Sequence, residues 1–253
     1  MKRAPIVLTS DFGLADEYVG VLKGVILSIN PDASLVDLTH EIPPQDIRRA
    51  ATLISRNHAY FPIGSIQLCI VDPGVGSRRR LLVVSACNQF FIGPDNGIFS
   101  AILKTEEAAT VHELTTRDWF LDEISTTFHG RDIMAPAAAR LSLGAPINEA
   151  GLPVPRASCV ILPETLPIIG ESKLVGEIES IDRFGNLITN INKAHLETFC
   201  GENNIILRIK TMAVPFHRTS YRDLPDEKPA AIVNSSKLVE ISVKNGNAAE
   251  LLG

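Results

Sequence analysis

The sequence contains little of what marks membrane-spanning, secreted or nucleic-acid-binding proteins. No stretch approaches the ~20 apolar residues that a membrane-spanning helix needs, and no secretory leader pattern precedes the first strand-like run at Ile6. Positive charge is not in excess, because 24 lysines and arginines stand against 29 acidic residues and the formal net charge is -5. This balance gives no electrostatic footprint for nucleic acid or for an anionic membrane surface. We therefore expect a cytoplasmic protein that binds neither.

Cysteine is scarce and widely spaced. The four cysteines are Cys69, Cys87, Cys159 and Cys200. They form no C-x-x-C pair and no zinc-type spacing. Two of them lie in apolar strand-like runs, where a free thiol behaves as a small hydrophobic side chain. We expect all four to be buried, reduced thiols.

Motifs for common cofactors and nucleophiles are also absent. Gly74-Val75-Gly76 matches neither a P-loop nor a dinucleotide-binding fingerprint, and no Ser or Cys nucleophile motif is found. The only basic cluster, Arg78-Arg79-Arg80, lies beside this glycine-rich turn. It therefore indicates a local anion or turn role rather than a nucleic-acid patch.

The first ~150 residues alternate between strand and helix patterns. Continuous apolar runs, typical of buried strands, cover 6–9, 35–38, 66–71, 81–86 and 90–92. Helical spacing or helix-start signals cover 18–26, 46–58 and 133–143. Strands separated by helices favour a mostly parallel sheet with crossover connections. We expect an N-terminal α/β domain over residues 1–150.

The pattern changes after Gly151. Four prolines fall within residues 151–170, which have no sustained helical period, and this favours a linker over 151–172. Short β-type runs follow at 174–178, 187–191, 205–209, 231–233 and 238–243. Several alternate apolar and polar residues, as half-buried antiparallel strands do. We expect a smaller antiparallel β domain over 173–253.

Polar clusters occur where the predicted strands of the α/β domain end. They are SDFGLAD (10–16), DPGVGSRRR (72–80), GPDNG (93–97) and, before the alanine-rich helix, FHGRD (128–132). Ligands of α/β sheets bind beyond the carboxyl ends of the strands. Each cluster also has a structural explanation. Asp11 or Asp16 can cap a helix, and segments 72–74 and 94–97 are common turn chemistry. His129 can be a surface histidine, and Arg131 or Asp132 can be charges at a helix start. The residues alone predict a polar site with an acid, a guanidinium and an imidazole, without naming its substrate.

Six segments, in order, carry a resemblance that names the substrate. They are TSDFGLADEYVG (9–20), VDPGVGSRRR (71–80), GPDNG (93–97), FHGRDIMAPAAA (128–139), IDRFGNLITNI (181–191) and NSSKLVEISVKNGNAA (234–249). Together they span nearly the whole chain. In this order they resemble the S-adenosylmethionine (SAM) hydroxide adenosyltransferase family, which is related to SAM-dependent fluorinases and chlorinases.

The resemblance implies a fold, an assembly and an activity. The fold is an N-terminal α/β domain joined to a C-terminal antiparallel β-barrel-like domain. The assembly is a homotrimer, with SAM between the N-terminal domain of one subunit and the C-terminal domain of its neighbour. The activity is hydrolysis of SAM to adenosine and methionine, with SAM as substrate and with no cofactor or metal.

The resemblance also assigns roles to residues. The family's Asp/Arg/His set falls on Asp72, Arg79 and His129, and Arg79 keeps the offset of seven residues from the aspartate. Guanidinium stays protonated, so Arg79 stabilises a developing hydroxide, whereas either His129 or Asp72 accepts the proton.

The substrate-binding residues implied by the resemblance come from both domains. Asp11 binds the ribose hydroxyls, Asn186 the adenine edge, and Tyr221 stacks on the base. The methionine ammonium is bound by Asp16 and Asp182, assisted by Ser235. The chain departs from the family pattern after that serine, where it has Ser236-Lys237.

Two alternatives remain. A SAM-dependent halogenase uses a halide nucleophile and needs no base; as the resemblance implies, halogenases lack the Asp and His of the set, and fluorinases insert residues between the strands at 81–86 and 90–92. This chain keeps Asp72 and His129 and joins those strands by three residues, 87–89. A non-catalytic SAM or adenosine sensor is the other alternative, and assaying adenosine release separates all three.

Overall fold

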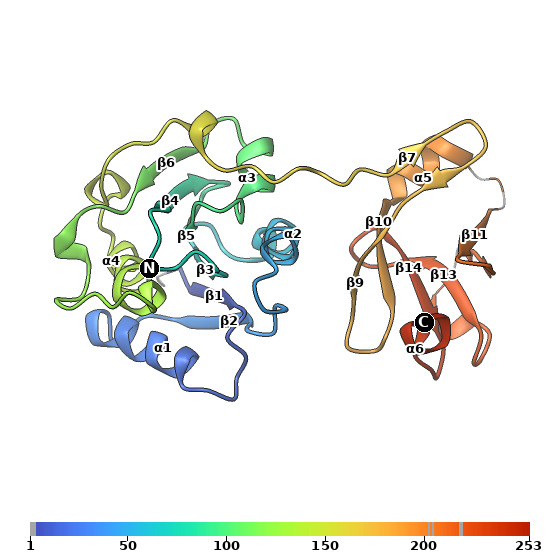
Figure 1. Ribbon diagram of the computed structural model, residues 1–253, viewed down its shortest axis with the longest axis horizontal. Helices are drawn as coiled ribbons and strands as arrows, with labels where there is room; N and C mark the ends of the chain where they lie inside the picture. Colours follow the sequence, from blue (N-terminus) through green and yellow to red (C-terminus); the bar gives the residue numbers. More distant parts are fainter. Residues whose placement is uncertain (1–3, 202, 204, 218–219) are drawn as a thin grey trace. The chain divides into compact units, whose positions relative to one another are not determined.

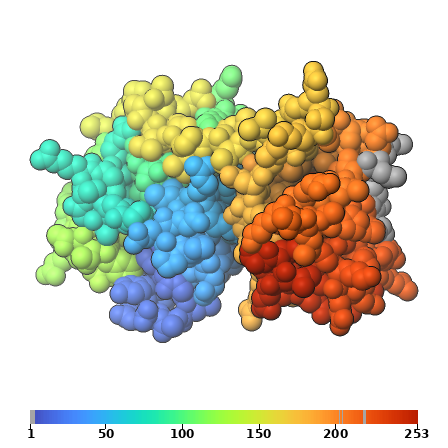
Figure 2. Space-filling model, turned by 45° about the vertical axis from the view of Figure 1, so that its right-hand side comes forward, coloured from blue at the N-terminus to red at the C-terminus, as the bar shows by residue number. Residues whose placement is uncertain are grey.

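The structure is a computed structural model that describes residues 4–201, 203, 205–217 and 220–253. The chain divides into two compact units, Met1–Leu162 and Pro163–Gly253 (Figure 1). Each unit has its own hydrophobic core. Figure 2 shows the molecular surface, coloured along the chain. Residues just after Gly151 belong to the first unit, where the Val154 amide donates to the Val111 carbonyl at 2.8 Å. The predicted domain limits of 1–150, 151–172 and 173–253 stay predictions.

The first unit is built on a six-stranded sheet in the order β2-β1-β3-β5-β4-β6. Strands β2, β1, β3 and β5 are parallel neighbours, and β4 is antiparallel to both β5 and β6, so the predicted mostly parallel sheet is confirmed. The strands are β1 (Ile6–Ser10), β2 (Leu35–Thr39), β3 (Ile66–Ile70), β4 (Leu81–Ala86), β5 (Gln89–Pro94) and β6 (Thr110–Glu113).

Helices cover both faces of this sheet (Figure 1). They are α1 (Tyr18–Ile29), α2 (Ile47–Asn57), α3 (Ser100–Thr105) and α4 (Ala135–Ser142). Side chains alternate across a strand, and on β3 Ile66, Leu68 and Ile70 join the core beneath α1 and α4, whereas Cys69 joins the core beneath α2 and α3. Because both faces are buried, the strands read as continuous apolar runs.

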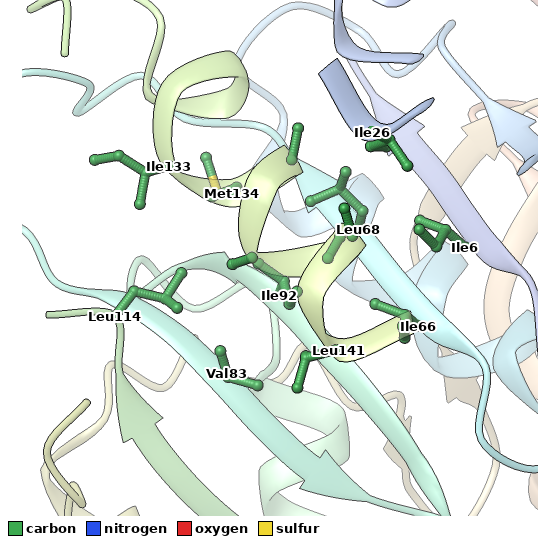
Figure 3. Close-up of a cluster of buried hydrophobic side chains, with 14 of the residues drawn as sticks. Ile6, Ile26, Ile66, Leu68, Val83, Ile92, Leu114, Ile133, Met134 and Leu141 are labelled. Atoms are coloured by element: carbon green, nitrogen blue, oxygen red, sulfur yellow. The ribbon is translucent and has the colours of Figure 1, made fainter. Parts of the chain in front are cut away.

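Figure 3 shows the core on the α4 side. Ile133, Met134 and Leu141 of the helical segment share one core with Leu68 and Ile92 of the sheet. A single π-helical turn, Gly130–Met134, precedes α4, and Pro136 lies in the first turn of α4, where proline is tolerated. This packing holds the start of the helical segment, which follows His129, against β3.

The second unit is antiparallel throughout its described strands. Its main sheet has the order β13-β14-β10-β9, and two-stranded pairs are formed by β11 with β12 and by β7 with β8. The strands are β7 (Ile168–Ile169), β8 (Leu174–Val175), β9 (Ile178–Ile181), β10 (Leu187–Asn192), β11 (Ile206–Ile209), β12 (Met212–Pro215), β13 (Pro229–Val233) and β14 (Leu238–Val243). Helices α5 (Lys193–Cys200) and α6 (Ala248–Leu252) complete it.

Two sequence predictions need correction. The single strand predicted over 174–178 is two strands, β8 and β9, in different sheets. The cysteines are all free, but only Cys69 and Cys159 are buried, whereas Cys87 and Cys200 are half-buried. Cys87 lies in the tight turn between β4 and β5 rather than inside a strand. Among the described residues, no helix has the length and apolar character needed to cross a membrane.

Candidate active site

Three parallel strands bring their carboxyl ends to one edge of the first sheet. Strand β3 lies between β1 and β5, so the residues that follow these strands are neighbours in space. Asp11 follows β1, Asp72 follows β3 by two residues, and Asp95 follows β5. This edge is where ligands of open α/β sheets bind, and the polar clusters predicted from the sequence lie there.

Asp72 and Arg79 form a two-pronged ion pair across the loop 72–80. Arg79 Nε donates to Asp72 Oδ1 at 2.6 Å, and Arg79 Nη2 donates to Asp72 Oδ2. Their side chains are only 6% and 9% exposed, respectively. A paired guanidinium and carboxylate with this geometry is rigid and strongly oriented. Burial makes the pair costly to break, since either partner alone would be a poorly solvated charge.

His129 is the third member of the cluster. Arg79 Nη2 lies 3.0 Å from His129 Nδ1. Because a guanidinium only donates, Nδ1 must accept, and the proton of the neutral imidazole is then on Nε2. Burial and the neighbouring Arg79 charge lower the pKa of His129 from its usual 6.5, which favours this neutral form. The site therefore has a fixed cation and an Nε2–H donor.

The three adjacent arginines have different surroundings. Arg80 donates to Asp95 Oδ2 from Nε at 2.8 Å and from Nη2 at 2.6 Å, and it also donates to the Ser158 carbonyl at 2.6 Å. Arg80 thus ties the segment after residue 155 to the sheet edge. Arg78 is exposed. Of the three arginines, Arg79 is the one that contacts both Asp72 and His129 among the described residues, and its catalytic role stays a prediction.

The loop before His129 is held by a buried carboxylate. Asp132 is fully buried and accepts from the Ser125 amide and hydroxyl, both at 2.7 Å, and from Arg131 Nε at 2.6 Å. Burial opposes its ionisation, but the hydrogen bonds from Arg131 and Ser125 outweigh this and lower the pKa of Asp132. Asp132 therefore fixes the loop 125–128 directly before His129.

An aromatic cluster links the β1–α1 loop to the same region. The rings of Phe12, Tyr18 and Phe128 lie 5.3–5.7 Å apart between centroids. Edge-on pairs at these distances are favourable. The cluster connects the loop that carries Asp11 and Asp16 to the residue before His129.

Asp11 and Asp16 do not cap the helix that follows them. The N-cap of α1 is Glu17, and among the described residues no side-chain hydrogen bond caps that helix. Asp11 instead accepts from the Gln45 amide at 2.8 Å through Oδ2, whereas Asp16 is exposed. The structural alternative considered for these two residues is wrong, and their binding roles stay predictions.

One buried network was not predicted from the sequence. His40 Nδ1 lies 2.7 Å from Ser10 Oγ, and His40 Nε2 lies 3.1 Å from Asp37 Oδ1. The order Ser–His–Asp resembles a hydrolytic triad, but Ser10 is 1% exposed and its oxygen accepts from the Phe12 amide. The network therefore supports the start of the β1–α1 loop rather than attacking a substrate. No local motif marks it, because its members come from two strands and the segment after them.

The predicted residues of the second unit form two groups around its main sheet. Asp182 accepts from the amides of Phe184 and Asn186 through Oδ1 and from Asn186 Nδ2 through Oδ2, each at 2.9 Å. Tyr221 is exposed and donates to Glu240, and Ser235 lies exposed in the turn between β13 and β14. Asp182 and Asn186 thus brace each other, and their roles toward a ligand stay predictions. Among the described residues, no group of three or more metal-binding side chains is found.

Two family models match this chain, one in its N-terminal part and one in its C-terminal part. Residues 6–151 match the SAM hydroxide adenosyltransferase N-terminal domain, and residues 176–253 match the corresponding C-terminal domain. The chain is 37% identical to a protein of Salinispora arenicola named (R)-S-adenosyl-L-methionine hydrolase, over 98% of this chain and 93% of the relative. It is 25% identical to a fluorinase of Nocardia brasiliensis, over 78% of this chain and 74% of that protein.

A solved structure is similar to this chain over nearly its whole length. The crystal structure of an uncharacterized conserved protein from Thermotoga maritima matches with a TM-score of 0.91 and 32% identity, covering 98% of this chain and 95% of that one. Both family domains are present, in order. The chain therefore belongs to the SAM hydroxide adenosyltransferase family.

Proposed function

We propose that this protein hydrolyses SAM to adenosine and L-methionine by attack of water or hydroxide at the ribose C5′. The observation that carries the proposal is the direct contact of Asp72, Arg79 and His129 at the ligand-binding edge of the sheet. The family and its relative named as a SAM hydrolase support the same reaction.

In this reaction the nucleophile needs activation, whereas the leaving group does not. The sulfonium of SAM leaves as the neutral thioether of methionine, so the leaving group needs no proton. Water is a weak nucleophile at carbon, and a site that stabilises hydroxide lowers the barrier. Arg79 supplies a fixed positive charge, and His129, whose Nδ1 accepts from Arg79, adds an Nε2–H donor to the same cluster.

The tautomer bears on which residue takes the proton. With Nδ1 accepting from Arg79 and Nε2 already protonated, His129 has no free lone pair for a proton from water. Asp72 is anionic, and each carboxylate oxygen retains acceptor capacity beside its bond from Arg79. We therefore assign Asp72 as the proton acceptor and His129 as a hydrogen-bond donor to the nucleophile.

A halide nucleophile is less compatible with this site. Strands β4 and β5 are joined by only Cys87 and Asn88, whose positive φ angles of 52° and 56° form a tight hairpin turn without an insertion. The anionic Asp72 at the proposed nucleophile site would also oppose a halide. These two features favour oxygen as the attacking atom.

The remaining features of the proposal concern the substrate and the assembly. Asp11 binds the ribose, Asp16 and Asp182 with Ser235 bind the methionine ammonium, and the adenine is bound by Asn186 and Tyr221. The C-terminal unit closes into a barrel-like domain, the protein is a cytoplasmic homotrimer with SAM at subunit boundaries, and no cofactor takes part. Support comes from the family membership and from the presence of these residues on both units.

The test is a product assay on the purified protein with SAM and no added metal. Adenosine and methionine should appear in equal amounts, and added chloride or fluoride should yield no halogenated nucleoside. The Arg79→Ala variant should be inactive, whereas the exposed Arg78→Ala variant should retain the parent rate. Binding of SAM without product release would contradict the proposal and favour a sensor.

A further inference from the structure

A buried carboxylate in the second unit has no part in the function described so far. Glu240, on β14, is 2% exposed. Its Oε1 accepts from Tyr221 Oη at 2.5 Å and from Ser242 Oγ at 2.7 Å, and its Oε2 accepts from Asn234 Nδ2 at 3.0 Å. These three partners are neutral. Burying a carboxylate among neutral donors is costly, so its retention calls for an explanation beyond packing.

Glu240 lies on the face of the sheet opposite the main core of this unit. Val239, Ile241 and Val243 on the same strand enter that core, and side chains alternate along a strand. Glu240 pairs directly with Ile232 of β13, which belongs to a separate small cluster with Leu224. The segment that begins at Tyr221 therefore covers the face from which Glu240 projects.

The first partner, Tyr221, is a predicted base-stacking residue. Its side chain reaches Glu240 with the hydroxyl while the residue stays 49% exposed. Burial of the hydroxyl and the adjacent Glu240 carboxylate raise the pKa of Tyr221, and the Asp182 charge adds to this. The phenol therefore stays a protonated donor, and the ring is fixed at its polar end.

The second partner, Asn234, fixes the turn that carries Ser235. Its Oδ1 accepts from the Ser236 amide at 2.9 Å and from the Leu238 amide at 3.1 Å, so its amide group cannot be reversed without losing both. The Nδ2 group then points to Glu240. Lys237 closes the turn with a φ of 62°. The turn and the carboxylate are thus joined by one oriented side chain.

We propose that Glu240 is a positioning residue that holds two parts of the ligand site through one buried carboxylate. Through Tyr221 it orients the ring that stacks on adenine, and through Asn234 it orients the turn whose Ser235 binds the methionine half. The inference rests on the proposed function, from which it takes the roles of Tyr221 and Ser235.

The test uses the two products as separate ligands in calorimetric titrations of the full-length protein. Tyr221→Phe keeps the ring but frees it from Glu240, so adenosine should bind about tenfold more weakly and methionine unchanged. In Glu240→Gln the amide can still accept from Tyr221 but presents a donor to Asn234, so methionine should bind about tenfold more weakly and adenosine nearly unchanged.

Two further variants separate positioning from general stability. Asn234→Asp combined with Glu240→Gln restores a donor–acceptor pair with its direction reversed, and it should recover methionine binding. Ser242→Ala removes a Glu240 partner that contacts neither predicted binding residue, and both affinities should stay at the parent values.

The outcomes distinguish this proposal from the proposed function. Equal weakening of both ligands in Tyr221→Phe and Glu240→Gln, or the same weakening in Ser242→Ala, would overturn the positioning role. If the variants show the predicted split between ligands but the parent releases no adenosine from SAM, the positioning role stands and hydrolysis fails. A parent that releases adenosine from SAM but binds neither product overturns the positioning role and leaves hydrolysis standing.

Discussion

The contact between Arg79 and His129 determines how the imidazole can act. Arg79 donates to Nδ1 at 3.0 Å, which leaves the proton on Nε2 and makes the ring a hydrogen-bond donor at that nitrogen. Spacing in the sequence left both His129 and Asp72 as candidate bases. It could not decide between them, because the tautomer depends on a contact between residues 50 positions apart.

Two substitutions at His129 distinguish a donor from a base. Glutamine can accept from Arg79 with its oxygen and donate with its nitrogen, but it cannot take up a proton. We expect His129→Ala to lower kcat by about 10²- to 10³-fold with little change in KM for SAM, and His129→Gln to recover part of that loss. Steady-state kinetics on both variants provides the measurement. A glutamine variant as inactive as the alanine variant would instead identify His129 as the base.

The pH dependence follows from the same contact. Protonation of His129 places an N–H opposite Arg79 and a second positive charge beside it, so only the neutral form is active. Its pKa is lowered from 6.5 by burial and by Arg79, so kcat/KM of the parent relative to His129→Gln should fall as pH drops through that lowered pKa. Taking the ratio cancels the supply of hydroxide, which both proteins share. A ratio independent of pH would contradict the assignment.

Protonation of His129 also lowers the free energy of unfolding, so stability and activity both fall as the pH drops. The unfolded chain takes up the proton near pH 6.5, above the folded-state pKa of His129. Between these two pKa values the unfolded state binds more protons, so lowering the pH favours unfolding.

At the scale of elements, the site depends on two loops meeting. Gly76 of the loop 72–80 has a φ of 78°, and a Cβ there would lie 2.5 Å from the Thr126 carbonyl oxygen. Thr126 belongs to the loop that ends at His129. Backbone atoms meet at this point, so no side chain can rotate away to make room.

Substitution of this glycine should therefore disturb the cluster. Gly76→Ala should lose about 1–3 kcal/mol of unfolding free energy and most of kcat, because the two loops must separate. Gly144→Ala is the matched control, since Gly144 has a φ of 95° with open space around it. It should be destabilised by backbone strain alone and keep the parent kcat. Denaturant unfolding and kinetics on both variants test this, and equal kcat values would show that the loop contact is not needed.

The elements differ in how well the sequence predicted them. Strands such as β3 and β4 were located within one residue, because burial on both faces produces continuous apolar runs. Helix α3 has six residues and β6 has four, too few for a periodic pattern to stand out, and both were missed. The predicted strand at 174–178 is interrupted at Gly176, where a Cβ would lie 2.5 Å from Asn190 Oδ1. That close approach is tertiary and could not be read from local spacing.

Some residues of the candidate site could be predicted from the sequence, and others could not. The acids at the strand ends follow from the position of ligand sites in α/β sheets, and the choice of Arg79 followed from the family spacing. Glu240 and the Ser10–His40–Asp37 network were missed, because their partners come from separate segments and each residue lies in an ordinary apolar or turn sequence.

At the scale of the whole molecule, the proposed ligand residues are divided between the two units. If the protein is the proposed homotrimer, co-expression of His129→Ala with Asp182→Ala should give more activity than either variant alone, because mixed trimers would contain some sites with both halves unmutated. Activity per trimer tests this, measured on mixed trimers isolated by two different tags, one on each variant. Mixed trimers without activity would place the whole site within one chain.

The central claim is that oxygen from water displaces methionine at the ribose C5′. The most direct measurement is turnover of SAM in oxygen-18 water, followed by mass spectrometry of the adenosine. We predict one oxygen-18 atom in the 5′-hydroxyl of every adenosine formed and none in methionine. Adenosine without the label would contradict the displacement mechanism, and a halogenated nucleoside in place of adenosine would contradict the choice of nucleophile.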